Sequence, residues 1–361
     1  MRADRGALTP MQRTLRLDAW AIAWVLAWGG AWSLLVMERI LEFHEGFLRT
    51  ALVALGFALI AGSARWATRK LVGSRLRHLL LLLLAVLALR EGFRKVLRER
   101  YTASPPLKEV KPGESLWHPV TTTDLALRYY ALESTKLSVE RLRVVFLTDL
   151  HVTPALPLAY YEHIHELVSA QHPDLIVMTG DYASQPQNIA LLARLFTRPW
   201  PARFGTFAVL GNHDFWTDAA RIRKTLSAGD VSFVSNGCER LPDSVGRVAI
   251  CGTEAPWGPA LSGKLDGRDL NLVLSHTPDN IYRLAEQGAS LVFAGHTHGG
   301  QIRLPWLGAA VVPSRFGRLF DQGHFKVEGA DLFVSAGVGA DAPSVRLYCQ
   351  PEILVIDIDR E

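Results

Sequence analysis

Five short apolar segments in the C-terminal two-thirds of the chain are each followed, within one to four positions, by histidine, aspartate or asparagine. These predicted strands span residues 141–148, 174–179, 204–210, 271–275 and 291–294. Between the first two, residues 160–171 have the apolar spacing of a helix. Strands that alternate with helices predict an α/β core, and ligand sites in such cores lie beyond the carboxyl ends of the strands. We therefore expect the five polar clusters to meet at one site.

The polar clusters have the chemistry of a metal site. They contribute Asp149, His151, Asp181, Asn212, His213, Asp214, His276, His296 and His298. Asp149 and His151 are two positions apart, as are His296 and His298, and residues i and i+2 of an extended segment point to the same side. Carboxylate, amide and imidazole donors suit manganese, iron, cobalt and zinc ions, and no cysteine joins the clusters to form a structural zinc site. Two such ions about 3.5–4 Å apart can clamp a phosphate and stabilise the leaving oxygen.

The order of the motifs, D-x-H, G-D, G-N-H-D, a single histidine and G-H-x-H, resembles the signature of calcineurin-like metallophosphoesterases over about two-thirds of the chain. The resemblance implies an α/β fold with a double β-sandwich of two mixed sheets flanked by helices. It also implies two divalent metal ions, with manganese placed first and iron, zinc or cobalt as alternatives. The implied ligands are Asp149, His151 and His298 for one ion and Asn212, His276 and His296 for the other, with Asp181 bridging both.

The same resemblance implies a proton donor that binds no metal. His213 would protonate the leaving group or stabilise its charge, and Asp214 would orient His213. An imidazole suits this step because histidine exchanges protons near neutral pH. Outside the motifs, Arg346 precedes the last apolar segment, and we expect it to form a structural salt bridge, with a contact to substrate phosphate as the alternative. The glycines of residues 337–339 are too weak a signal for a phosphate-binding loop.

The first third of the chain has the composition of a membrane anchor. Residues 19–37 form an uncharged run of 19 residues, which nearly spans a hydrocarbon core of about 30 Å. A cleaved signal peptide is disfavoured because the run is long and no small-x-small site follows it. Residues 50–64 are expected to cross the membrane as well, and residues 78–89 to form a buried or interfacial helix. The predicted organisation is a membrane-anchoring helical region at 1–100, a linker at 101–120 and a catalytic domain at 121–361.

Basic residues are concentrated in the same part of the chain. Residues 1–118 contain 18 Lys and Arg against 9 Asp and Glu, whereas the other 243 residues contain 21 against 26. This division argues against a nucleic-acid partner and favours contact with anionic membrane lipids. The basic residues around the first two apolar runs predict a multi-pass protein of the inner (cytoplasmic) membrane with its catalytic domain on the cytoplasmic side. If residues 78–89 also cross, the catalytic domain lies on the opposite side.

The three cysteines, Cys238, Cys251 and Cys349, all lie in the predicted catalytic domain. Their spacing matches neither a metal site nor a redox motif, and their number is odd. The sequence therefore predicts no disulfide framework and favours a reducing compartment.

These features predict hydrolysis of a phosphodiester or pyrophosphate bond, with a membrane-associated phosphoester or nucleotide-lipid substrate and with membrane lipids as partners. The leading hypothesis is a phosphodiesterase of unspecified substrate. The alternative, from similarity to membrane-bound members of the family, is a UDP-2,3-diacylglucosamine pyrophosphatase of lipid A biosynthesis. A hypothesis from a different class is a catalytically inactive membrane scaffold. The complete motif set argues against a scaffold, because such proteins lose the acid histidine or several ligands.

Overall fold

The computed structural model describes residues 86, 89–90, 92–112, 117–304, 308–309, 311–342 and 344–361. The chain divides into two units, Met1–Leu97 and Arg98–Glu361, and the described residues of the first unit are helical. The predicted membrane runs at 19–37 and 50–64, and most of the run at 78–89, lie outside the described residues, so they stay predictions. Among the residues that are described, no helix is both long enough and apolar enough to cross a bilayer.

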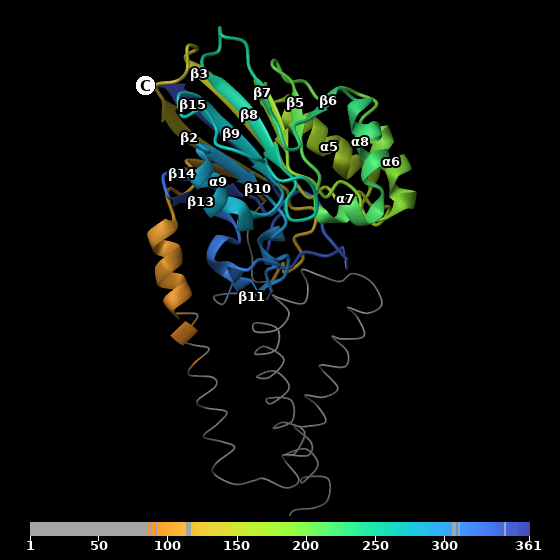
Figure 1. Ribbon diagram of the computed structural model, residues 1–361. Coiled ribbons are helices and arrows are strands. Elements are labelled where there is room, and N and C mark those ends of the chain that lie inside the picture. Colours follow the sequence, from red (N-terminus) through yellow and green to blue (C-terminus); the bar gives the residue numbers. More distant parts are fainter. Residues whose placement is uncertain are drawn as a thin grey trace, which may run out of the picture. The chain divides into compact units, whose positions relative to one another are not determined.

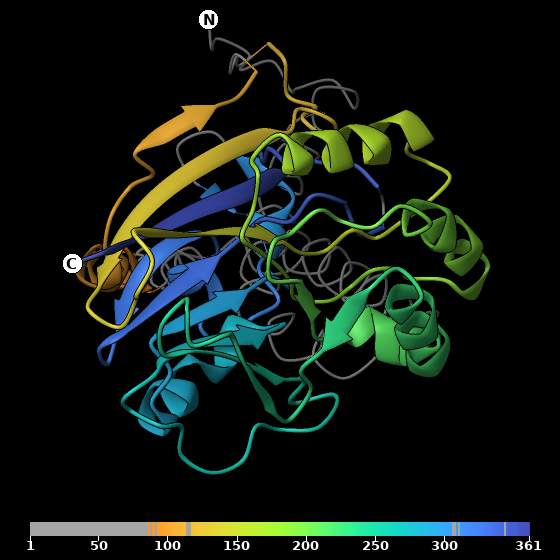
Figure 2. The same ribbon diagram turned by 90° about the horizontal axis from the view of Figure 1, so that it is seen from above.

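The second unit contains a seven-stranded mixed sheet in the order β1-β2-β15-β3-β4-β5-β6. Its strands are Lys108–Val110 (β1), Ala126–Ser134 (β2), Arg141–Leu147 (β3), Leu175–Met178 (β4), Thr206–Ala208 (β5), Val231–Phe233 (β6) and Glu352–Arg360 (β15). β3, β4, β5 and β6 are parallel to one another, while β15 runs parallel to β2 and antiparallel to β3. In Figure 2 the dark blue C-terminal strand lies between the yellow strands β2 and β3.

A six-stranded mixed sheet has the order β13-β14-β10-β9-β8-β7. Its strands are Cys238–Arg240 (β7), Val248–Thr253 (β8), Leu270–Ser275 (β9), Leu291–Ala294 (β10), Gly323–Val327 (β13) and Ala330–Val334 (β14). The four central strands are parallel, and the two edge strands pair antiparallel to their neighbours. A small hairpin of Arg303–Leu304 (β11) and Gly308–Ala309 (β12) lies outside both sheets.

The two sheets pack face to face around a shared apolar core. Phe146 of β3 contacts Phe293 of β10 edge to face, with ring centroids 5.4 Å apart, and Phe293 stacks on Phe333 of β14. Burial of alternate strand residues on both inner faces supplies the main driving force for this pairing. The result is the predicted double β-sandwich of two mixed sheets.

Helices cover the outer face of the seven-stranded sheet (Figure 1). They are Leu158–Ser169 (α5), Ile189–Leu195 (α6) and Ala219–Ser227 (α8), and the shorter Asn212–Thr217 (α7) precedes α8. Ile164, Leu192 and Leu226 of these helices are buried against the outer side chains of β3, β4 and β5. Ile281–Gln287 (α9) contacts β13 of the other sheet. The predicted α/β architecture with flanking helices is therefore present.

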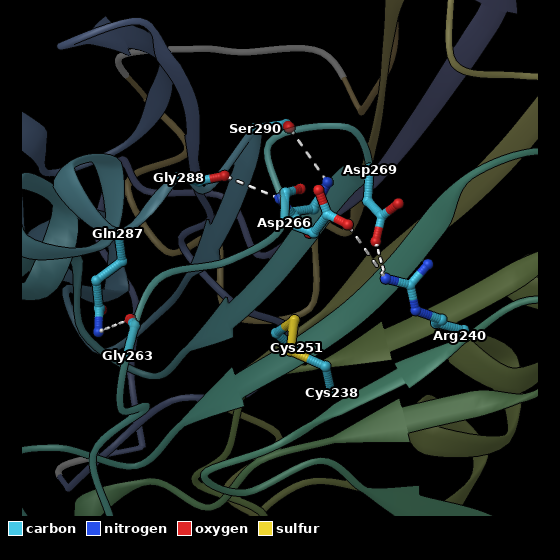
Figure 3. The surroundings of a disulfide bond; sticks show 10 residues. Cys238, Arg240, Cys251, Gly263, Asp266, Asp269, Gln287, Gly288 and Ser290 are labelled. Carbon is cyan, nitrogen blue, oxygen red and sulfur yellow. Dashed lines mark hydrogen bonds and ion pairs between the residues drawn. A yellow bond between two sulfur atoms is a disulfide. The ribbon is translucent and has the colours of Figure 1, made fainter.

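Two expectations about the second unit need correction. Part of the predicted linker, Lys108–Val110, is the edge strand β1 and pairs antiparallel with β2. Cys238 and Cys251 form a disulfide, although the sequence predicted no disulfide framework. These cysteines face each other directly across β7 and β8, with Cα atoms 4.0 Å apart (Figure 3). A single cross-strand bond depends on strand register, which a separation of 13 residues does not reveal.

Candidate metal centre

The nine polar residues predicted for the site all lie just beyond the carboxyl ends of strands in the two sheets. β3 leads into Asp149 and His151, β4 into Asp181, and β5 into the start of α7. In the second sheet, β9 leads into His276 and β10 into His296 and His298. Because these strands are parallel within each sheet, their carboxyl ends lie at a common edge, and residues up to 149 positions apart meet there.

Asp149, His151 and His298, which we call the Asp149 group, bring their donor atoms together. The Nε2 atom of His298 lies 3.5 Å from Oδ1 of Asp149 and 3.1 Å from Nε2 of His151. Two imidazole nitrogens this close cannot both carry a proton, and their facing lone pairs suit a cation. Asp181 adjoins this group through its Oδ2, which lies 3.5 Å from Nε2 of His151.

Asn212, His276 and His296, the His276 group, meet on the other side of Asp181. The Nε2 atom of His276 lies 2.9 Å from Oδ1 of Asn212 and 3.2 Å from Oδ2 of Asp181. The rings of His276 and His296 are 4.9 Å apart between centroids. Asp181 therefore belongs to two of the three clusters of possible metal ligands among the described residues, with Asp149, His151 and His298 in one and with His276 and His296 in the other.

Five of these residues have left-handed backbone conformations. The φ angles are 53° at Asp149, 40° at His151, 57° at Asp181, 68° at His296 and 52° at His298. Non-glycine residues adopt this region rarely, and the strain costs about 1–3 kcal/mol at each position. Backbone hydrogen bonds between the loops offset part of that cost, since Asp149 donates to Gly180 and His151 to Asp181 at 3.0 and 2.9 Å.

The glycines before the clusters allow the loops to approach closely. A Cβ atom on Gly211 would overlap Oδ1 of Asp181. A Cβ atom on Gly295 would overlap Oδ2 of Asp149 and the hydroxyl of Thr148. Any larger residue at these positions would therefore displace a carboxylate of the site.

His213 lies beside the Asp149 group. Its backbone N–H donates to Oδ1 of Asp181 at 2.9 Å, and its ring meets that of His151 edge to face at 4.7 Å. The Nε2 atom lies 3.8 Å from Oδ2 of Asp341, a half-buried carboxylate that the sequence motifs did not indicate. The position of His213 is compatible with proton transfer at the site, and that role stays a prediction.

Asp214 is completely buried and organises the backbone of the site. Its carboxylate accepts hydrogen bonds from the N–H groups of Asp181, Tyr182 and Gly211, at 2.8, 2.9 and 2.9 Å. These contacts bind the loop after β4 to the start of α7. We expected Asp214 to orient His213, and these bonds fix the backbone from which that side chain projects.

Burial controls the protonation of the site. It raises the pKa of Asp149 to about 7. It also lowers the pKa of His151, His296 and His298 well below the usual histidine value, with neighbouring positive groups as the second cause. Neutral imidazoles offer their lone pairs to a cation, and a bound cation would favour the ionised form of Asp149.

Two further residues support the ligands and had no sequence signal. The hydroxyl of Ser184 lies 2.6 Å from Nδ1 of His151. The ring of Trp257 lies 5.0 Å from that of His296 and 5.7 Å from that of His276. Neither residue lies in a motif with recognisable spacing, and only the fold brings them to the site.

Comparison with known proteins agrees with this geometry. Residues 142–300 match the family described as calcineurin-like phosphoesterase. Every ligand candidate from Asp149 to His298 lies inside the matched region. The candidate metal centre therefore lies wholly within the part of the chain that matches this family.

Three curated bacterial relatives are similar to this chain over about 60% of its length. An uncharacterised metallophosphoesterase, YkuE of Bacillus subtilis, is 28% identical over 229 residues, covering 78% of that protein. The phosphodiesterase YaeI of Escherichia coli is 28% identical over 227 residues, covering 82% of it. The UDP-2,3-diacylglucosamine pyrophosphatase LpxG of Chlamydia muridarum is 26% identical over 284 residues, covering 83% of it.

Proposed function

Because this chain contains a calcineurin-like metallophosphoesterase domain and is a metal-dependent phosphoester hydrolase, we propose that it cleaves a phosphodiester or pyrophosphate bond of a membrane-associated substrate with the help of two divalent cations. The observation that carries the proposal is the position of Asp181 between the Asp149 group and the His276 group. A carboxylate shared by two ligand sets is suited to bridging a pair of ions.

The donor atoms fit such ions. Each group combines imidazole nitrogens with carboxylate or amide oxygens, a set that suits manganese, which we place first, and also iron, zinc and cobalt. When bound, the ions would supply positive charge that polarises the phosphoryl oxygens and lowers the pKa of a water molecule.

Residues of the chain would position the metal ligands and protonate the leaving oxygen. Asp214 holds the start of α7 against the β4 loop, so that Asn212 and His213 lie next to Asp181. His213 would donate its proton to the leaving oxygen, which avoids the release of an unstable alkoxide. Asp341, 3.8 Å from Nε2 of His213, would orient the imidazole for that transfer.

Exposed apolar side chains, one of them beside His213 and the others close in sequence to site residues, support an amphiphilic substrate. Trp216 is 40% exposed, and its ring lies 5.1 Å from that of His213. Ile302 and Leu304, which follow the His298 loop, are 37% and 48% exposed, and Val345 is 39% exposed. Apolar surface around a polar site is typical of proteins that bind lipids or membrane surfaces.

A second candidate is the UDP-2,3-diacylglucosamine pyrophosphatase reaction of lipid A biosynthesis. The similarity to LpxG over 284 residues favours it, since that relative is named for this activity. The similarity to a phosphodiesterase over a comparable length favours the broader assignment, which we place first.

One assay separates these functions. The full-length protein, purified in detergent with Mn²⁺, is tested on bis-p-nitrophenyl phosphate and on UDP-2,3-diacylglucosamine, with and without EDTA. We expect diester hydrolysis that EDTA abolishes and Mn²⁺ restores. Turnover of the UDP-lipid alone would favour the second candidate, whereas tight Mn²⁺ binding without any turnover by wild type or His213→Ala would indicate a scaffold.

We also propose that the catalytic domain is anchored to the inner membrane and faces away from the cytoplasm. The side depends on residues 78–89, which have five Lys and Arg on each flank, at 65–77 and at 90–100, so loop charge alone does not decide it. The Cys238–Cys251 disulfide favours an oxidising compartment and thus a third crossing, in place of the cytoplasmic side expected from the loop charges. Protease digestion of spheroplasts tests this, and a domain cleaved only after membrane lysis would refute it.

A further inference from the structure

Arg346 is completely buried, with 0% of its surface exposed. The sequence suggested a salt bridge or a contact with substrate phosphate, and the structure supports neither. Within the described part of the chain, the guanidinium forms no ion pair with a carboxylate, and a buried group cannot reach a substrate in solvent. Both expectations for Arg346 were therefore wrong, and its hydrogen bonds indicate a different role.

The guanidinium donates to main-chain carbonyls of two separate loops. Its Nε donates to Gly339 at 2.7 Å and its Nη2 to Ala336, both in the loop that follows β14. Its Nη1 donates to the carbonyl of His298 at 3.1 Å. One planar group thus joins a ligand residue of the Asp149 group to the segment after β14.

The segment after β14 is in turn packed against the segment that carries Asp149. Val338 donates to the carbonyl of Thr148 at 3.1 Å, and Gly339 donates to the carbonyl of Asp149 at 2.7 Å. Gly337 has a φ of 75°, and a Cβ atom there would lie 2.6 Å from Cβ of Asp149. The glycines of residues 337–339 therefore serve as a packing surface for Asp149.

These contacts form a continuous connection from Asp149 through the loop after β14 and Arg346 to His298. A buried guanidinium without a carboxylate partner costs more free energy than an apolar residue of the same volume, so its presence is not explained by stability. Lysine could not replace it, because a single ammonium lacks the rigid fork of donors that reaches carbonyls in different directions.

Given the metal site of the proposed function, on which this inference rests, we propose that Arg346 is a positioning residue that sets the distance between Asp149 and His298 for the cation they share. Residues that hold metal ligands in place change metal affinity or activity by about 10–100-fold when they are replaced. The His276 group has no contact of this kind to Arg346 among the described residues, so the effect is expected at one cation of the two.

The test compares Mn²⁺ binding by calorimetry in full-length wild type, Arg346→Lys and Arg143→Lys. Arg143 is a matched control, because it donates to the carbonyl of Gln171 and pairs with Asp357 far from the ligands. We expect Arg346→Lys to lower the affinity for one Mn²⁺ by about 10–100-fold and to leave the affinity for the other unchanged. Diester turnover should recover when the Mn²⁺ concentration is raised. Arg143→Lys should bind both ions as wild type does.

Gly337→Ala provides a second variant, since it keeps the Arg346 side chain and disturbs the same connection where Gly337 meets Asp149. It should lower the affinity for the same Mn²⁺, and it replaces Arg346→Lys in the test if that variant fails to fold. Wild-type Mn²⁺ affinity in a folded Arg346→Lys or Gly337→Ala would overturn the inference. If the wild type binds Mn²⁺ but cleaves neither the diester nor the UDP-lipid, the proposed function is wrong. The inference about Arg346 is then still tested by comparing Mn²⁺ binding among the variants.

Discussion

The two ligand groups that meet at Asp181 are held by different parts of the fold. In the His276 group, His276 is fixed by residues at the ends of two other strands. Its Nδ1 lies 2.6 Å from the carbonyl of Thr179, just after β4, and its own carbonyl accepts from Gly295, just after β10, at 2.8 Å. The Asp149 group instead depends on residues 336–346, which belong to the C-terminal part of the chain. The His276 group is therefore held mainly by residues at strand ends, whereas the Asp149 group also needs contacts from a segment that is distant in the sequence.

This difference has a consequence for how each group responds to substitution. A strand end is part of the cooperative core, so disturbing it changes stability and metal binding together. A connection made by loops can be weakened while the core stays intact. We therefore expect variants near the Asp149 group to separate metal affinity from stability, and variants near the His276 group to change both.

The largest effect is expected from Asp181→Asn, which removes the charge shared by both groups. We expect both Mn²⁺ sites to weaken and diester turnover to fall by about 10³-fold or more, because a bridging carboxylate serves each ion. Metal analysis after dialysis and a turnover assay measure this. Retention of two tightly bound ions would show that the groups do not share Asp181 and would break the comparison.

His213→Ala tests the residue that belongs to neither group. Loss of a general acid lowers turnover by about 10²–10⁴-fold, and the loss should be larger for an alkyl leaving group than for p-nitrophenolate, which needs no proton. Mn²⁺ binding should match wild type. Equal losses for the two leaving groups would argue against proton donation.

Arg223→Met tests whether stability and metal affinity change together near the His276 group. Arg223 pairs with Glu254, whose Oε1 accepts from the N–H of Leu210 at 2.9 Å, just before Asn212. Its loss leaves a buried carboxylate without its cation, so we expect thermal stability and the affinity of one Mn²⁺ to fall together, the affinity by about tenfold. A change in affinity at unchanged melting temperature would contradict the distinction drawn above.

The pH dependence of metal binding should come from the Asp149 group. Burial raises the pKa of Asp149 to about 7, so protons compete with the cation below that pH. Lowering the pH from 8 to 6 should weaken Mn²⁺ binding by about tenfold through this residue, because the ionised fraction falls by that factor. Calorimetry in buffers of different ionisation enthalpy should detect the released proton, and affinity independent of pH would oppose this.

The smallest effect on metal binding is expected from Cys238→Ser with Cys251→Ser. The disulfide joins β7 and β8 at the edge of the sheet, where Arg240 also pairs with Asp269 (Figure 3). Arg247 pairs with Asp269 as well. Closing a loop of this length stabilises a domain by about 2–4 kcal/mol, so the variant should unfold more easily while both Mn²⁺ affinities stay unchanged. Altered metal affinity would show that the edge is coupled to the site.

The sequence predicted the fold well, and it predicted that the ligand candidates lie together, because both depend on local patterns. Apolar strands followed by polar residues identified β3, β4, β5, β9 and β10 to within about two residues at each end. Asp149 and His298 could be placed at one edge because strands of a parallel sheet end together.

The parts that failed depend on contacts between distant segments. Arg346, Asp341 and the Cys238–Cys251 bond have no local pattern, and their partners are set by how the C-terminal loops and edge strands pack. A strand as short as β1 also has too few residues to show alternation, so we expected a linker there.

At the residues of the site that have left-handed backbone conformations, the side chain needed for activity also lowers the stability of the fold. Glycine at Asp149, His151, Asp181, His296 or His298 would relieve strain of about 1–3 kcal/mol while deleting a ligand. A descendant of this protein released from selection for hydrolysis would therefore gain stability by drifting toward glycine there. Backbone strain and the capacity to bind a metal ion therefore reside in the same five residues of this site.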